Sequence, residues 1–264
     1  MEKRTENVTK FYEKIEEDKR LLSSRQGQLE YYITMNYIHR FLKEGSKVLE
    51  IGAGTGRYSI ALAKEGYEVS SIELVEDNLK VLRENAKGIT NIDVRQGDAI
   101  DLSCYEDNSF DVTLVFGPMY HLYEEKDVQK SLDEAIRVTK KGGTILVAFL
   151  SVHAIMCSNY LYKWGTFTDG FNENFDEKFK VRHFEEQLFT GYDICEFEDL
   201  FKEKEVDYIT TVAVDNVLEI AERRDDFTLP DEDFETFKKY QLLVCEKREL
   251  LGSSSHLLYI CKKR

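Results

Sequence analysis

The sequence predicts an α/β protein built on a doubly wound parallel sheet. From residue 46 to residue 150, short apolar runs of strand length alternate with segments that have helical spacing. This alternation is the pattern of successive βαβ units, which build parallel sheets. Two of the predicted helices end on a glycine, at Gly66 and Gly88, which is a common way to stop a helix. Because crossovers between parallel strands are right-handed, helices should cover both faces of the sheet.

The elements can be placed in order along the chain. Residues 28–43 carry a mostly apolar stripe at helical spacing, and a charged helix is expected before them over 4–20. The predicted strands are 46–52, 67–73, 91–98, 110–116, 144–150, 206–216 and 256–264. The predicted helices beyond residue 45 are 57–66, 76–88, 126–143, 195–204 and 231–250.

The segment 151–200 interrupts this rhythm. It is rich in aromatic residues and asparagine and has no steady period, so we interpret it as an insertion after the fifth strand. Insertions at the carboxyl edge of a sheet often form lids or pocket walls. Its aromatic side chains could line a pocket or pack in a core, and the sequence leaves both open for Tyr160, Tyr162, Trp164 and Phe167.

We expect a single domain over 1–264. It would consist of a helical N-terminal cap (1–44), a binding core (45–150), the insertion or lid (151–200) and the C-terminal part of the sheet (201–264). A chain of 264 residues is long enough to bury one large core.

Composition narrows the class of function. The net charge of −14 disfavours nucleic acid as a partner, because such a surface repels phosphate backbones. The charged N-terminus shows no signal peptide, and no apolar run approaches the length of a membrane span. The five cysteines are scattered and the five histidines show no zinc spacing, so we expect free thiols, no metal and a cytoplasmic location.

The most informative motif is the run VLEIGAGTGRYS at 48–59. A strand leads into Gly52, Gly54 and Gly56, and a helix then begins. Glycines at such a turn let a ligand approach the backbone closely. A dinucleotide site would show G-x-G-x-x-G, whereas the spacing here is G-x-G-x-G with Arg57 next. Glu50 would suit a cationic ammonium and would be a poor neighbour for a pyrophosphate.

Two further acids follow at the ends of the next strands. Glu73 ends the second strand, where an acid can accept both hydroxyls of a ribose. Asp98 ends the third strand and can accept a hydrogen bond from the amine of a base. An ammonium, a ribose and an adenine together match S-adenosylmethionine.

On these residues the sequence resembles the class I S-adenosylmethionine-dependent methyltransferases with an E-x-G-x-G-x-G turn. The resemblance covers about 46–150 and includes Phe110-Asp111, Arg137-Val138 and Lys141-Gly142-Gly143. It implies a Rossmann-like sheet of seven strands, mostly parallel with an antiparallel last strand, and methyl transfer with release of S-adenosylhomocysteine. It also implies a set of cofactor-binding residues: Tyr32, Glu50, Gly52, Ala53, Gly54, Gly56, Arg57, Glu73, Leu74, Asp98, Ala99, Phe116 and Gly117.

Within this set the resemblance gives three groups a role. Gly52 to Gly56 back the methionine part, Glu73 binds the ribose hydroxyls and Asp98 binds the adenine amine. Tyr32 lies on a helix that this family often lays over the cofactor, although its helical spacing also fits ordinary core packing.

The run FGPMYHL at 116–122 follows the fourth strand. Pro118 stops that strand, and the resemblance places the loop opposite the methyl group. Tyr120 and His121 are therefore the candidate catalytic residues, with His121 either a proton acceptor or a structural hydrogen-bonding group. Adenine N6-methyltransferases of nucleic acids keep an Asn/Asp-Pro-Pro-aromatic loop here, and this chain lacks it.

The predicted function is methyl transfer from S-adenosylmethionine to an O, N, C or S atom of a small molecule, with neither nucleic acid nor membrane as partner. Two alternatives stay open. The chain could be a catalytically silent S-adenosylmethionine-binding scaffold, or a nicotinamide-dependent oxidoreductase, which the missing third glycine and Glu50 disfavour.

Overall fold

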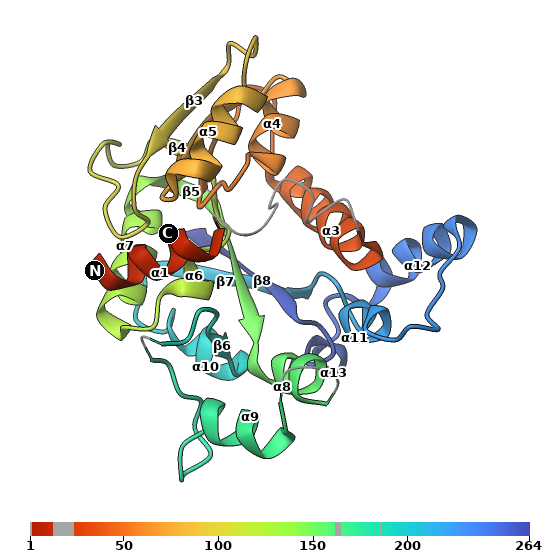
Figure 1. Ribbon diagram of the computed structural model, residues 1–264. Helices are drawn as coiled ribbons and strands as arrows, with labels where there is room; N and C mark the ends of the chain where they lie inside the picture. Colours follow the sequence, from red (N-terminus) through yellow and green to blue (C-terminus); the bar gives the residue numbers. More distant parts are fainter. Residues whose placement is uncertain (1, 13–23, 162–164, 185) are drawn as a thin grey trace.

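The computed structural model describes residues 2–12, 24–161, 165–184 and 186–264 (Figure 1). The helix expected over 4–20 is therefore described only in its first part, and Tyr162 and Trp164 lie outside the described residues. The strands are β1 (Lys47–Ile51), β2 (Glu68–Glu73), β3 (Ile92–Gln96), β4 (Phe110–Val115), β5 (Thr139–Ser151), β6 (Gly191–Tyr192), β7 (Val206–Ala213) and β8 (His256–Lys263). The helices up to β5 are α1 (Glu2–Tyr12), α3 (Arg25–Phe41), α4 (Arg57–Lys64), α5 (Glu76–Asn85), α6 (Pro118–His121) and α7 (Glu125–Val138). Those that follow are α8 (Val152–Tyr160), α9 (Phe167–Asn174), α10 (Ile194–Asp199), α11 (Leu218–Glu222), α12 (Asp231–Val244) and α13 (Arg248–Leu251).

All eight strands form one sheet with the order β3-β2-β1-β4-β5-β8-β7, and the short β6 pairs with β5. Strands β1 to β5 pair in parallel, whereas β8 is antiparallel to both β5 and β7. The predicted fold class, including an antiparallel last strand, is confirmed. The strand that the sequence did not predict is β6, which lies inside the insertion.

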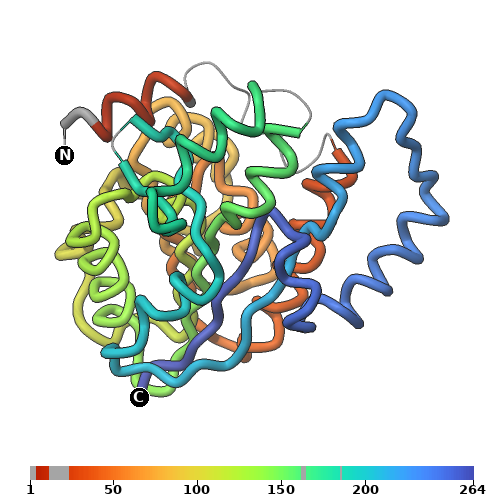
Figure 2. Tube along the Cα trace, turned by 90° about the horizontal axis from the view of Figure 1, so that it is seen from below, coloured from red at the N-terminus to blue at the C-terminus, as the bar shows by residue number. Residues whose placement is uncertain are grey.

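Helices cover both faces of the sheet, as the alternation of side chains along each strand requires. On β1, Leu49 and Ile51 join a core with α7, α10 and α13, whereas Val48 joins a second core with α3, α4 and α12. Figure 1 shows this layered arrangement, and Figure 2 shows α11 and α12 beside α3 at the side of the molecule away from α1.

Several boundaries differ from the expected ones: the helix expected over 231–250 is split into α12 and α13, and α7 is shorter than expected. The sequence predicts a helix over 126–143, but α7 ends at Val138 and β5 begins at Thr139. The Thr139 hydroxyl donates to the Ala135 carbonyl at 2.6 Å and so satisfies an acceptor at the helix end. Gly142 then takes a φ of 76° beside a register shift between β4 and β5. The Lys-Lys-Gly-Gly run is therefore an irregular strand start and not a helix end.

The insertion contains more regular structure than its sequence suggests. Helix α9 begins with a capping box, in which Thr166 and Asp169 satisfy each other's backbone N–H groups. Ser151 caps α8, and Asp193 caps α10. No helix among the described residues is long and apolar enough to cross a membrane.

Candidate cofactor and acceptor site

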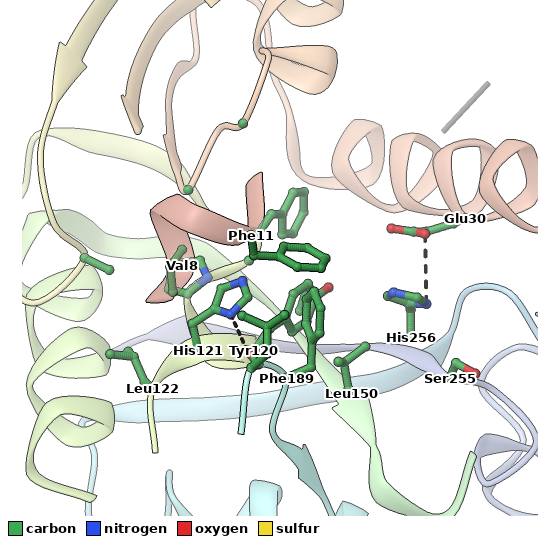
Figure 3. A pocket seen from close by; sticks show the side chains of 18 of the residues that line it. Val8, Phe11, Glu30, Tyr120, His121, Leu122, Leu150, Phe189, Ser255 and His256 are labelled. Carbon is green, nitrogen blue, oxygen red and sulfur yellow. Dashed lines mark hydrogen bonds and ion pairs between the residues drawn. The ribbon is translucent and has the colours of Figure 1, made fainter. Parts of the chain in front are cut away.

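A cavity of about 820 Å³ lies at the carboxyl edge of the parallel strands. One part is lined by the loops that follow β1, β2, β3 and β4, and the rest by α1, α3, the insertion and the start of β8. In Figure 3, Val8, Phe11, His121 and Phe189 gather at one end of the labelled set, and Glu30, Ser255 and His256 lie at the other.

The glycine turn has the backbone that only glycine adopts easily. Gly52, Gly54 and Gly56 have φ values of 77°, 56° and 89°. A Cβ on Gly52 would lie 2.4 Å from the Phe116 carbonyl oxygen and 2.7 Å from Pro118 Cδ. The turn after β1 therefore packs directly against the loop after β4, which brings the two predicted motifs together.

Glu73 is part of this turn as well as part of the cavity wall. Its carboxylate accepts hydrogen bonds from the Gly54 and Val75 backbone N–H groups, each at 2.7 Å. The residue is only 5% exposed. Glu73 is therefore a buried part of the turn, and the neighbouring Leu74 also lines the cavity.

Glu50 lies under the first turn of α4. It accepts hydrogen bonds from the Ser59 backbone N–H at 2.9 Å and from the Ser59 hydroxyl. Burial raises the pKa of Glu50 to about 7, and the nearby Glu73 contributes to the rise, despite the opposing hydrogen bonds from Ser59. A cation in the cavity would favour the ionised form.

Asp98 is engaged by the N-terminal helix. Its carboxylate forms an ion pair with Arg4 of α1, and its second oxygen accepts the Ile100 N–H at 3.3 Å. Arg4 is itself buried. The acid at the end of the third strand is therefore covered by α1, beside the buried Ala99, which also lines the cavity.

The loop after β4 forms the short helix α6, with Pro118 in its first turn. Phe116, Gly117, Tyr120 and His121 all line the cavity. His121 Nδ1 lies 2.7 Å from the Leu188 carbonyl oxygen, which can only accept, so Nδ1 carries the proton. Burial lowers the pKa of His121 to about 4, and the charge of Arg4 adds to this effect.

Two other predicted residues lie in different surroundings. Arg57 lines the cavity with Ala53, and its guanidinium lies 4.7 Å from the centre of the Tyr31 ring. Tyr32 lies elsewhere, with the Lys238 ammonium 4.8 Å from the centre of its ring. The structure thus brings the other predicted residues around one cavity except Gly56, which packs against Leu82, and it leaves Tyr32 in a packing position.

Sequence reasoning missed a polar cluster at the other end of the cavity. His256 opens β8 and Glu30 lies on α3, and both face the cavity, while the buried Asp215 follows β7. His256 Nδ1 lies 2.7 Å from Asp215 Oδ2 and 4.0 Å from Glu30 Oε2. No short motif could have revealed this cluster, because its members are far apart in the sequence.

Comparison with known proteins identifies the family. A family model described as a methyltransferase domain matches residues 42–181, which is more than half of the chain. The chain belongs to the methyltransferase domain family. The resemblance noted in the sequence is thereby confirmed.

Curated relatives match part of the chain. A demethylmenaquinone methyltransferase of Staphylococcus haemolyticus is 33% identical over 162 residues, which cover 60% of this chain and 64% of that protein. A protein of the same name from Staphylococcus carnosus is 42% identical over 106 residues, covering 39% and 42%. The chain therefore aligns with less than two thirds of the length of either relative.

Solved structures resemble the whole fold. A protein from Pyrococcus horikoshii matches with a TM-score of 0.62 and 17% identity, covering 97% of this chain and 99% of that one. A structure described as an S-adenosylmethionine-dependent methyltransferase from Methanosarcina mazei gives 0.56 and 17%, covering 86% and 96%. Another match, at 0.58 and 14% identity, is a [4+2]-cyclase and covers 89% of this chain and 81% of that one. Identities this low show a shared fold and no more.

Proposed function

We propose that this protein binds S-adenosylmethionine in the cavity and transfers its methyl group to a small-molecule acceptor. The observation that carries this proposal is the set of three acids on three consecutive strand ends, Glu50, Glu73 and Asp98, around one cavity. Acids at these points suit an ammonium, a ribose and an adenine amine. A pyrophosphate would be repelled by them.

The residues around the glycine turn fit the cofactor. The buried Arg57 Nε has no hydrogen-bond partner among the described residues, and Arg57 lines the cavity. A buried donor of this kind is costly unless a ligand satisfies it, and a guanidinium suits the carboxylate of a methionine group. The bare backbone of Gly52 and Gly54 leaves room for that group to approach.

Each acid then has one proposed contact with the cofactor. Glu73 would bind the ribose hydroxyls while holding the turn through Gly54, and Asp98 would bind the adenine amine once Arg4 releases it. Glu50 would face the ammonium. When bound, the cofactor supplies an activated methyl group on a sulfonium, and the protein's task is to align the acceptor with it, since alignment alone can supply much of the rate.

The remainder of the cavity fits a small, mostly apolar acceptor. Phe11, Tyr120, Leu150 and Phe189 line it, and the polar groups gather around Glu30 and His256 (Figure 3). The net charge of −14 supports a small molecule over a nucleic acid. The five cysteines, all free thiols, favour the cytoplasmic location that the sequence predicts.

A turnover assay tests the proposal. The protein is incubated with S-adenosylmethionine and a panel of phenols, amines, thiols, carbon acids and demethylmenaquinone, for which the curated relatives are named. We expect S-adenosylhomocysteine and methylated product to form together with at least one small-molecule class and with no oligonucleotide. Cofactor binding without turnover across the panel would instead support the silent scaffold.

A further inference from the structure

The polar cluster at the far end of the cavity contains an Asp–His pair with defined geometry. Asp215 is fully buried, and its Oδ1 accepts from the Ser254 hydroxyl at 2.5 Å and from the Ser255 and His256 backbone N–H groups at 3.0 and 3.2 Å. Its Oδ2 accepts from Gln26 Nε2 at 2.8 Å and faces His256 Nδ1 at 2.7 Å. Both oxygens are thus fixed in place by donors from two segments of the chain, residues 254–256 and Gln26.

This geometry sets the tautomer of His256. An ionised carboxylate can only accept, so the hydrogen between the two side chains belongs to Nδ1. The pKa of Asp215 is lowered because the charge and hydrogen bond of His256, with the bonds from Ser254 and Gln26, outweigh the opposing effect of burial. The basic nitrogen of the neutral ring is then Nε2. An Asp that holds an imidazole in this way is the arrangement used by proton-accepting histidines in hydrolases.

Carboxylates from three parts of the chain lie around the ring. Glu30 of α3 is 4.0 Å from Nδ1, and Glu219 of α11 offers an oxygen within 4.8 Å of ligand atoms on both Asp215 and His256. Arg223 forms an ion pair with Glu219 at 2.9 Å and so balances part of this charge. On the side of α6 the Tyr120 ring meets the imidazole edge-on at 6.0 Å. Three nearby carboxylates stabilise an imidazolium if one forms.

The cluster also lies at a useful place along the sheet. The loops of the proposed cofactor site follow β1, β2 and β3, and Gly117 follows β4. His256 of β8 pairs with Leu150, which lies near the carboxyl end of β5. Because β5 is next to β4 in the sheet, β8 lies two strands beyond β4. Neighbouring strands are about 4.8 Å apart, so about 10 Å separates the backbones of β4 and β8. An acceptor of one or two rings would span this gap, with one end at the methyl group and one near His256.

We propose that His256, oriented by Asp215, is the general base that takes the proton from a hydroxyl, phenol or amine acceptor during methyl transfer. This proposal rests on the function proposed above. A lone pair on the acceptor atom forms the bond to the methyl carbon, and the electrons of the carbon–sulfur bond stay on sulfur in S-adenosylhomocysteine. The acceptor's proton passes to His256 Nε2 and then to solvent, so charge and atoms balance.

His121 is less suited to this step. Its Nδ1 donates to the Leu188 carbonyl, and a pKa of about 4 makes it a weak proton acceptor near neutral pH. A divalent cation between Asp215, Glu219 and His256 is the other use of these side chains. The donors that already occupy both Asp215 oxygens argue against it, because a metal would need one of those lone pairs.

The experiment compares His256→Gln and Asp215→Asn with the matched control His39→Gln, whose histidine is exposed and pairs with Glu65 on the surface. Turnover of an acceptor found in the panel is measured from pH 5.5 to 9, with the affinity for S-adenosylhomocysteine measured alongside. We expect His256→Gln to lower kcat by about 10²- to 10⁴-fold, to remove the acidic limb of the profile and to leave cofactor affinity within about threefold. Asp215→Asn should lower kcat, and His39→Gln should match the wild type.

A second readout needs no acceptor and therefore separates this proposal from the proposed function. Nitrogen-15 histidine NMR of the S-adenosylhomocysteine complex should show His256 with its proton on Nδ1, and Asp215→Asn should abolish that preference. A His256 proton on Nε2 would overturn the proposal even if methyl transfer is observed. So would unchanged kcat and pH profile in His256→Gln, or turnover that EDTA abolishes and Mg²⁺ or Mn²⁺ restores.

Discussion

Single residues in this protein carry structural and binding tasks together, and Glu73 is the clearest case. Its carboxylate fixes the glycine turn through the Gly54 and Val75 N–H groups and is also proposed to bind a ribose. The resemblance predicted the second task, but only the structure shows the first. An acid at a strand end can therefore belong to the core when the following turn folds back over it.

Replacing Glu73 should reduce both cofactor affinity and stability. Glu73→Gln should weaken S-adenosylhomocysteine binding at least tenfold, since a charge-assisted hydrogen bond contributes roughly 1.5–3 kcal/mol. Glu73→Ala should in addition lower the free energy of unfolding by about 1–3 kcal/mol, because the two backbone donors lose their partner. Calorimetry and urea unfolding measure the two effects.

Glu68→Gln is the matched control, since Glu68 is an exposed acid at the other end of the same strand. It should change neither quantity. Normal cofactor affinity in Glu73→Gln would remove the ribose role from Glu73.

Glu50 should make cofactor binding depend on pH. The pKa of Glu50 is about 7, so its carboxyl is largely neutral below that pH and ionises above it. An ammonium favours the ionised form, and affinity should therefore fall by roughly tenfold per pH unit below 7. Binding should also release up to about one proton, measured by calorimetry in buffers with different ionisation heats.

The raised pKa of Glu50 affects the stability of the ligand-free protein in the opposite direction. Because the folded-state pKa of Glu50 exceeds the ordinary value of 4.5, its contribution to stability is present at low pH and is lost as pH rises through 7.

Glu50→Gln should remove the pH dependence of binding between pH 6 and 7.5. Identical slopes in wild type and Glu50→Gln would show that another group is responsible.

At the scale of elements, α1 is the segment whose role is least visible in the sequence. Its charged sequence predicts a helix, but nothing local indicates that Arg4 reaches Asp98 at the end of the third strand. The pair holds α1 over the part of the cavity where an adenine is proposed to bind. Cofactor entry then requires this contact to rearrange.

Arg4→Ala should release α1. Amide hydrogens of residues 2–12 should exchange faster in Arg4→Ala than in the wild type when no ligand is present, because the helix loses its buried ion pair. Lys10→Ala is the control, since Lys10 is exposed on the same helix and pairs only locally with Glu6 in the described structure. Equal exchange in Arg4→Ala and the wild type would show that other contacts hold the helix.

Elements with a strong local pattern were predictable from the sequence, and those set by distant contacts were not. The strands β1 to β4 could be predicted from short runs of strand length, and the turn after β1 from the spacing of Gly52, Gly54 and Gly56. The early end of α7 depends on the Thr139 hydroxyl and a bulge, so periodicity placed that boundary too late. The caps that order α8 and α9 are short signals that the irregular composition of the insertion obscures.

At the scale of the whole molecule, the cavity has a proposed cofactor half and a proposed acceptor half, which lie over different strands of the sheet. The ends of β1 to β4 and the loops after them supply most of the residues that the resemblance assigned to the cofactor. The acceptor half combines α1, α3, the insertion and β8, which meet only after folding. Asp215, Glu30 and His256 lie on three separate segments, which is why sequence reasoning selected His121 and overlooked His256. The role of His121 stays a prediction, as does the single-domain organisation.

The central claim is that this cavity is a binding site for S-adenosylmethionine, and titration calorimetry with S-adenosylhomocysteine tests it most directly. We expect one molecule bound per chain, displacement by S-adenosylmethionine, no effect of NAD⁺, and weaker binding in Glu73→Gln. Binding of NAD⁺ with no heat from S-adenosylhomocysteine would contradict it.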